Sequence, residues 1–246
     1  MTNNGTQDKT NHTLGHQIWN SELVRWLFSL ERIEQRPSDP AEVLYRSFHI
    51  TARCRFNASI RLGKMGSFSF LTATLLSLGL ILIPVLQLAD IPLAYPEGLL
   101  SSLQVFFAVA VLIYTVINSS AHYETRAKAL NDCGDKIKEL SRQLRSDIFQ
   151  TKNQGTSLDL KPVNEMYTRI SVISENHSRA DYGLAMLQAS DLYHITGIPR
   201  LWLHFKVVYG NFETYILPIS LILAEFLVIL DLLGITHVLT VIFNPS

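Results

Sequence analysis

The sequence lacks the short motifs that mark most soluble enzymes. It has no Gly-rich phosphate loop, no Cys-x-x-Cys pair, no Gly-x-Ser-x-Gly turn and no His-Glu-x-x-His helix. Its only two cysteines, Cys54 and Cys133, make neither a disulfide framework nor a zinc cluster, and we expect both to be reduced thiols. We therefore predict no enzymatic activity, no metal site and no cofactor.

The chain also has no excess of charge of either sign. Its 21 Lys and Arg residues balance 21 Asp and Glu residues, so we expect no direct binding of nucleic acid. Residues 1–13 are polar, and no short apolar segment of the signal-peptide type precedes the first long apolar run. We expect that run to act as its own insertion signal, and residues 1–17 to be disordered.

Two long stretches, residues 65–89 and 98–121, contain no charged residue at all. At about 1.5 Å per residue, each is long enough as a helix to cross a hydrocarbon core of about 30 Å. The link between them contains Pro92 and Pro96, which favour a turn over a continuing helix. The pair is typical of a transmembrane helical hairpin.

Basic residues flank the hairpin on both sides, whereas the link contains Asp90 and Glu97 but no Lys or Arg. The positive-inside rule therefore places both flanks, and with them the N-terminus, in the cytoplasm. The flanking cations are Arg46, Arg53, Arg55, Arg61 and Lys64 before the hairpin, and Arg126, Lys128, Lys136, Lys138, Arg142 and Arg145 after it.

Helical periodicity describes most of the remaining chain, and no strand pattern is present. An apolar stripe predicts an amphipathic cytosolic helix in residues 18–42, packed on the protein itself rather than on a membrane surface. Residues 43–123 then comprise a lead-in helix and the hairpin, and residues 124–212 a cytosolic helical region. A stripe with steps of three, four and seven residues at positions 130, 137, 140, 144 and 148 is coiled-coil-like but too short to establish a coiled coil.

A third apolar segment, residues 213–246, includes Glu225 and Asp231. We expect its helix to span the bilayer from residue 215 to about residue 239, with the C-terminus outside. A carboxylate at mid-depth costs about 3 kcal/mol to insert, so Glu225 should face protein or water. The fold class is therefore expected to be an all-α membrane protein with a transmembrane hairpin, cytosolic helices and a third C-terminal transmembrane helix. Basic and aromatic residues suited to the cytoplasmic interface precede the third apolar segment; they are Arg200, Trp202, His204, Lys206 and Tyr209.

Polar residues of the second span fall on roughly one helical face: Gln104, Thr115, Asn118 and His122. The first span carries a comparable stripe of small and polar residues. The favoured interpretation is that such groups hydrogen-bond between helices and let them approach closely. In an oligomer the same faces, together with Glu225, would line a pore.

Several segments together carry a resemblance to a known family. Residues 53–57 (Arg-Cys-Arg-Phe-Asn) and 60–63 (Ile-Arg-Leu-Gly) lead into the hairpin, and a charged helix begins after it at residues 122–126 (His-Tyr-Glu-Thr-Arg). Tyr167 and residues 176–182 (Asn-His-Ser-Arg-Ala-Asp-Tyr) follow. Over roughly residues 43–193 the chain resembles the SLATT family, two-transmembrane proteins of bacterial conflict systems. The residues that match its motif are Asn176, His177, Asp181 and Tyr182.

His177 and Asp181 are four residues apart, so they would share one face of a helix. Two ligands are too few for a metal site, and no further cluster is visible in the sequence. The Asn, Ser and Asp residues of this segment suit a helix junction with a cap, which is the favoured interpretation.

The resemblance implies a multi-pass effector of the bacterial inner membrane, active in anti-phage conflict, that oligomerises and forms a pore or disrupts the membrane when triggered. Its expected partners are the lipid bilayer, further copies of itself, and a sensor, nucleotidyltransferase or reverse transcriptase encoded nearby. The sequence contains no recognisable nucleotide-sensor domain, so the trigger should come from a partner or from the cytosolic helices. The alternatives are a membrane-anchored scaffold that recruits a soluble partner, and a small ion channel or transporter.

Overall fold

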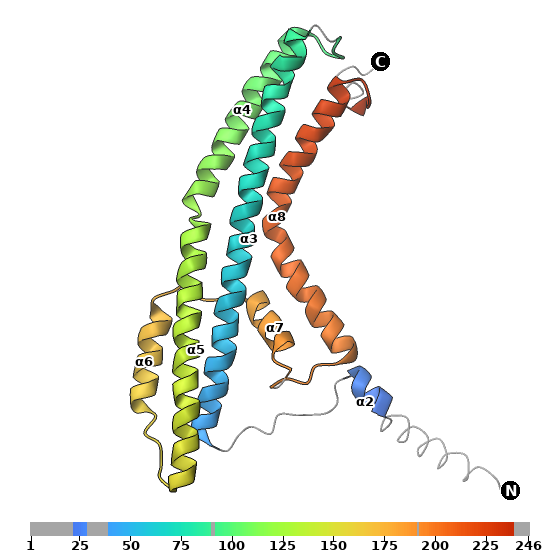
Figure 1. Cartoon of the computed structure of the whole chain (residues 1–246). Coiled ribbons are helices and arrows are strands. Elements are labelled where there is room, and N and C mark those ends of the chain that lie inside the picture. The colour runs from blue at the N-terminus through green and yellow to red at the C-terminus, as the bar shows by residue number, and fades with distance from the viewer. Residues whose placement is uncertain (1–21, 29–38, 90–91, 191, 239–246) are drawn as a thin grey trace, which may run out of the picture. The chain divides into compact units, whose positions relative to one another are not determined.

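The computed structural model describes residues 22–28, 39–89, 92–190 and 192–238, and every regular element of these segments is helical. The all-α fold predicted from the sequence is therefore confirmed. Residues 1–17 and the end of the third apolar segment lie outside the described residues. The helices, labelled in Figure 1, are α2 (Glu22–Phe28), α3 (Pro40–Leu88), α4 (Glu97–Ser120), α5 (Tyr123–Gln154), α6 (Lys161–Val172), α7 (Arg179–Gln188) and α8 (Gly197–Leu232).

The chain divides into two compact units. One, the polar unit, comprises Met1–Ser59 and Lys128–Asn211; the other, the apolar unit, comprises Ile60–Ala127 and Phe212–Ser246. Helices α3, α5 and α8 each begin in one unit and end in the other. The polar unit holds most of the charged residues, and the apolar unit holds the long uncharged stretches.

Three helical segments are long and apolar enough to cross a membrane. They lie within Pro40–Leu88, Glu97–Gln154 and Phe212–Leu232, each with a mean hydropathy of 2.2 over its most apolar stretch. This agrees with the predicted hairpin and third transmembrane helix. The third helix ends at Leu232, before a turn that contains Gly234, and so is shorter than the predicted helix to residue 239.

Local sequence explains where these helices begin and end. Asp39 precedes α3, and its Oδ1 accepts a hydrogen bond from the backbone N of Ala41 at 3.0 Å, which caps the helix next to Pro40. Pro96, with φ −65° and ψ 148°, precedes α4 in an extended conformation. His122 separates α4 from α5 in the left-handed conformation, with φ 47°.

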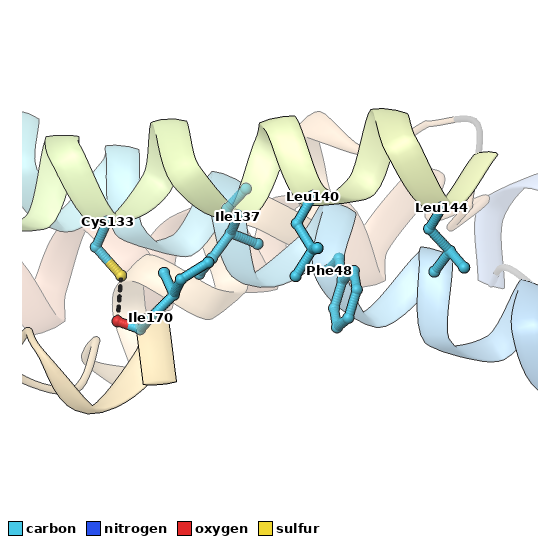
Figure 2. Close-up of a cluster of buried hydrophobic side chains, with 7 residues drawn as sticks. Phe48, Cys133, Ile137, Leu140, Leu144 and Ile170 are labelled. Carbon is cyan, nitrogen blue, oxygen red and sulfur yellow. Dashed lines mark hydrogen bonds between the residues drawn. The ribbon is translucent and has the colours of Figure 1, made fainter. Parts of the chain in front are cut away.

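The core of the polar unit lies between α3, α5 and α6 (Figure 2). The stripe predicted on α5 is its buried face, and it packs against Phe48 of α3 and Ile170 of α6. The thiol of Cys133 donates to the carbonyl oxygen of Ile170 at 3.6 Å, shown as a dashed line. Phe48 also stacks on Tyr167 with ring centroids 4.6 Å apart. The buried members of this cluster are Phe48, Ala52, Cys133, Ile137, Leu140, Leu144 and Ile170.

Ile60 does not share the buried environment of Phe48 and Ala52, although all three follow the same four-residue spacing. Its side chain is 57% exposed. A step of four residues turns about 40° too far around a helix of 3.6 residues per turn, so the third step has left the original face by about 120°. Spacing by fours therefore identifies a buried face only over two or three turns.

Helices α7 and α2 pack on the rest of the polar unit through small residues. Ala185 and Ala189 pack against Cys54 of α3. Gly197 has φ +57°, and a Cβ added there would lie 2.1 Å from the backbone oxygen of Leu27, just before the end of α2. Only glycine therefore suits this point, where the start of α8 meets α2.

Candidate functional site

In the apolar unit, α3 presents a buried stripe with alternating steps of three and four residues. Such steps average 3.5 residues and stay on one side of a helix. Thr72 is fully buried, and its hydroxyl donates to the carbonyl oxygen of Phe68 at 2.9 Å, so this polar group is satisfied within its own helix. The stripe is a surface of small, polar and apolar groups against which other helices pack. Its members are Leu62, Met65, Ser69, Thr72, Leu76, Gly79 and Ile83.

The polar residues predicted to share one face of α4 occupy two environments. Gln104, Thr115 and Asn118 are half-buried, whereas His122 is exposed beyond the end of α4. Nε2 of Gln104 donates to Oε1 of Gln87 on α3 at 3.4 Å, which links the two helices of the hairpin. The Thr115 hydroxyl donates to a carbonyl of its own helix at 2.8 Å. His122 thus differs from the other three because the chain changes direction there.

Glu225 of α8 lies against Gly79 of α3. The residue is 8% exposed, and a Cβ added at Gly79 would lie 2.3 Å from its Oε1 and 2.5 Å from its Cδ. The missing side chain of Gly79 therefore provides the space for the carboxyl group. Glu225 faces protein within this unit.

Asp231 is fully buried near the end of α8 and accepts several hydrogen bonds. Its Oδ1 accepts from the Thr236 hydroxyl at 3.0 Å and from the backbone N of Val238 at 2.8 Å, and its Oδ2 accepts from the Tyr95 hydroxyl. Desolvation, together with the hydrogen bond to Asp231 and its charge, raises the pKa of Tyr95 to about 12. The backbone N of Ala94 also donates to a carbonyl at the end of α8. These bonds attach the link between the first two spans to the C-terminal end of α8.

In the polar unit, two of the segments that carry the family resemblance come together. Residues 53–57 lie on α3, and residues 176–182 form the turn before α7 and its first turn. Arg55 donates to the carbonyl oxygen of Glu175, and Nδ2 of Asn57 donates to the carbonyl oxygen of Asp181 at 3.3 Å. These bonds join positions that are 120 and 124 residues apart in the chain. We call this place the motif junction.

Arg55 holds the end of α6 at the motif junction. The residue is only 3% exposed, and its second guanidinium nitrogen donates to the carbonyl oxygen of Ser171 at 3.5 Å. The last carbonyl groups of a helix lack partners within the helix and carry partial negative charge, so a buried cation is stabilised there. The Nε atom of Arg55 is buried and has no hydrogen-bond partner among the described residues.

Asp181 and Ser178 form a capping box at the start of α7. The backbone N of Asp181 donates to the Ser178 hydroxyl at 3.2 Å, and the backbone N of Ser178 donates to Oδ2 of Asp181 at 2.9 Å. The ring of His177 stacks on Tyr182 with centroids 6.5 Å apart, whereas Asn176 is exposed. Asp181 is thus a buried capping residue, and of the four motif residues it has the most extensive contacts.

Two titratable groups of the motif junction, Cys54 and His177, are shifted toward their neutral forms. Burial, and then the negative charge of Asp181, raises the pKa of the Cys54 thiol to about 12, so it is not a nucleophile at neutral pH. Burial, and then the positive charge of Arg55, lowers the pKa of His177. Within the described residues, no group of three or more His, Cys, Asp or Glu side chains is placed to hold a metal ion. The junction joins three helices rather than presenting reactive groups.

Two features of these sites went unrecognised in the sequence. The space at Gly79 for Glu225 pairs residues on different helices, and the only signal for it is a glycine within a stripe of small residues. For the hydrogen bond between Tyr95 and Asp231, the only signal in the sequence is that a second carboxylate, Asp231, occurs in the third apolar segment. Neither pairing follows from helical periodicity, because each depends on how α8 packs.

Comparison with known proteins identifies the family of this chain. The family model of the SMODS and SLOG-associating 2TM effector domain family 5 matches residues 38–230. This match is longer than the resemblance over residues 43–193, and it takes in most of α8. No curated protein and no solved structure matches the chain. Because the match covers well over half of its length, the chain belongs to the SMODS and SLOG-associating 2TM effector domain family 5.

Proposed function

We propose that this protein is a membrane effector of a bacterial conflict system, which oligomerises and opens a pore or disrupts the inner membrane when triggered. Its membership of an effector family and its three apolar helices support this role. The family name associates its members with SMODS and SLOG proteins, so a nucleotidyltransferase or a sensor encoded nearby is the expected source of the trigger, with a reverse transcriptase as a further candidate.

The observation that carries the proposal is the buried carboxyl group of Glu225 in the apolar unit. A carboxylate in an apolar helix costs about 3 kcal/mol to insert, so its presence favours a role that requires it. Three helices are too few to surround an aqueous path, and a pore would therefore need several copies. In the structure Glu225 and Gln104 lie against α3. We infer that this arrangement is closed, and that opening turns these groups toward a shared lumen.

Membrane potential and dye exclusion in cells test this proposal. Expression with the neighbouring genes and their trigger should depolarise the membrane, and Glu225→Leu should insert normally but depolarise it far less. Phe226→Leu is the matched control. Phe226 is the next residue in α8, its side chain is 56% exposed, and its replacement should not affect assembly. If the triggered wild-type protein leaves both the potential and dye exclusion unchanged, the proposal is wrong.

A membrane-anchored scaffold is the second candidate, and exposed apolar side chains on and just after α6 favour it. Met166, Val172 and Ile173 are 53%, 78% and 66% exposed in the polar unit, and such side chains suit a soluble partner. Replacing both spans of the hairpin with unrelated apolar helices distinguishes the two functions, since a scaffold keeps its activity and a pore loses it. A constitutive channel or transporter would instead conduct as purified protein without any trigger.

The proposed orientation places the N-terminus in the cytoplasm, and three spans then place the C-terminus outside. A reporter enzyme fused after Ser246 should therefore be active only if it is of an extracytoplasmic type. Activity of a cytoplasmic reporter at this position would mean that the third apolar helix does not cross the bilayer.

A further inference from the structure

The polar unit contains a hollow between α7 and the first half of α8. Its volume is about 690 Å³, and Met186, Leu203 and Val207 form an apolar part of its lining. Arg179 and Lys206 contribute two cationic side chains to the same lining. A concave site with an apolar floor and a few convergent charged groups is the usual form of a small-molecule site.

The charges of this hollow are of one sign. Among the residues that the structure describes, no Asp or Glu side chain belongs to its lining. Arg179 and Lys206 are exposed, and neither makes an ion pair with any residue that the structure describes. The carboxylate of Asp181 lies close by in the sequence, but it is buried and bound to Ser178 in the capping box. An anionic group would therefore meet two cations and no competing carboxylate.

One polar group in the lining has no partner within the part of the chain described. Nδ1 of His177 is buried and makes no hydrogen bond there. A buried ring nitrogen without a partner is costly, so a ligand or water that supplies one would be stabilised. This nitrogen is a second observation that points to a bound ligand, independent of the two cations.

An exposed aromatic face runs along α8 beside the hollow. Trp202, Phe205 and Tyr209 are 65%, 61% and 61% exposed, and they stack in sequence with centroids 6.0 Å and 6.2 Å apart. Tyr209 also lines the hollow. Exposed Trp and Tyr side chains are typical of the interface between membrane and water, because they join an apolar ring to a polar group.

The same helix enters the apolar segment directly after the hollow. Gly210 lines the hollow, and the apolar part of α8 starts at Phe212. At about 1.5 Å per residue these positions are about 3 Å apart along the helix axis. No acidic residue occurs from position 198 to position 212. A lipid headgroup at the membrane surface is therefore within reach of the hollow when α8 crosses a bilayer.

We infer that this hollow binds one anionic phospholipid, with Arg179 and Lys206 on the headgroup phosphate and the glycerol and upper acyl chain over Met186, Leu203 and Val207. A free phosphate compound would use the two cations but leave the apolar floor uncovered. A zwitterionic lipid would cover the floor but bring its own cation to a site that already has two. The inference goes beyond the proposed function, since it requires only that α8 enters a membrane and not that a pore forms.

Native mass spectrometry of the full-length protein in detergent tests this site. The probes are short-chain phosphatidylglycerol and phosphatidylcholine with identical acyl chains, and glycerol phosphate as a soluble competitor. We expect retention of one phosphatidylglycerol with at least about tenfold preference over phosphatidylcholine, and no displacement by glycerol phosphate. Equal retention of the two lipids, or displacement by glycerol phosphate at a similar concentration, would overturn the inference, the latter in favour of a soluble anion.

Two kinds of variant separate charge from shape. Removal of both cations in Arg179→Gln/Lys206→Gln should weaken phosphatidylglycerol binding about 25-fold, since each cation near an anionic lipid contributes about fivefold. The control Lys136→Gln/Lys152→Gln removes two exposed cations of α5 that lie outside the hollow, and it should bind as wild type does.

Filling the hollow is the second test. Gly210→Phe places a ring beside Ala180, whose Cβ lies 3.7 Å from the position of a Cβ at Gly210, and it leaves both cations in place. It should also weaken binding of phosphatidylglycerol, with unchanged thermal unfolding as evidence of a normal fold. Wild-type binding in both the charge variant and the filled variant would show that the lipid binds elsewhere.

Discussion

The fit of Glu225 against Gly79 leads to a prediction about one methyl group. In Gly79→Ala the new Cβ would lie 2.3 Å from Oε1 of Glu225, whereas ordinary contacts begin near 3.4 Å. The carboxyl group, or α8 with it, must therefore retreat by about 1 Å. The carboxyl is the flexible end of its side chain and can rotate, but the residue is only 8% exposed and has little space into which to move.

The expected size of this effect follows from two opposing contributions. Overpacking a buried site by one methyl group typically costs about 1–3 kcal/mol. Replacing a glycine inside a helix with alanine typically gains about 0.5–1 kcal/mol. Gly63 offers the matched control in the same helix, because a Cβ added there meets no atom of the described residues within 4 Å. Gly63→Ala should therefore stabilise the protein, and Gly79→Ala should be less stable than it by about 1–3 kcal/mol.

A double-mutant cycle assigns the cost to the Glu225 carboxyl. In the background Glu225→Ala the clash is gone, so Gly79→Ala should then stabilise as Gly63→Ala does. The coupling energy between the two positions should be about 1–3 kcal/mol, measured by denaturant unfolding in detergent micelles. If Gly79→Ala stabilises the wild-type protein as much as Gly63→Ala, or if its effect is the same in both backgrounds, then Glu225 does not occupy the space at Gly79.

Three further predictions concern other contacts. Gly197→Ala combines a φ of +57° with a clash against the backbone of α2. It should therefore lower the thermal unfolding temperature more than Gly155→Ala, where φ is +67° and the added Cβ meets no described atom. Equal effects of the two substitutions would contradict the contact with α2. Tyr95→Phe removes one hydrogen-bond donor from the buried carboxylate of Asp231 and should lower the free energy of unfolding by about 1–3 kcal/mol. Tyr209→Phe should lower it little, and similar losses would contradict the hydrogen bond between Tyr95 and Asp231. The folded protein keeps the Cys54 proton until pH about 12, whereas the unfolded chain releases it above pH 9.0. Stability measured by urea unfolding should therefore fall above pH 9 in wild type and fall less in Cys54→Ala; identical pH profiles would contradict the raised pKa.

The helices and their buried faces could be predicted because they depend on local pattern. The stripe on α5 places Ile137, Leu140 and Leu144 in the core, and the helical repeat of 3.6 residues is enough to identify them from the sequence. Helical spacing alone does not describe the surroundings of Ile60 and His122. Ile60 lies where a four-residue repeat has drifted off the buried face, and His122 lies where a backbone turn, invisible to periodicity, ends the helix.

The contacts that build the candidate sites could not be predicted in this way, because they join distant parts of the chain. Arg55 is one of several cations before the hairpin, and all of them contribute alike to the positive-inside pattern. Only the packing of α3 against α6 shows that this one is buried on carbonyl oxygens at and just beyond the end of α6, whereas Lys64 is exposed. The family resemblance pointed to its segment, but it did not distinguish a binding residue from one that joins helices.

The two carboxylates of α8 differ in a way that bears on the proposed opening. Asp231 is bound by donors from three other residues, so its burial is compensated and its role is to hold the end of α8. No hydrogen-bond donor from the described residues reaches Glu225, and its carboxyl oxygens keep a little exposed surface although the residue is only 8% exposed, so it is held less firmly than Asp231. Movement of α8 away from Gly79 toward water would stabilise Glu225 and would be opposed by the bond between Tyr95 and Asp231. In the proposed mechanism Tyr95→Phe should then raise the leak of the untriggered protein, and adding Glu225→Leu should remove that increase, because it removes the group that gains from opening.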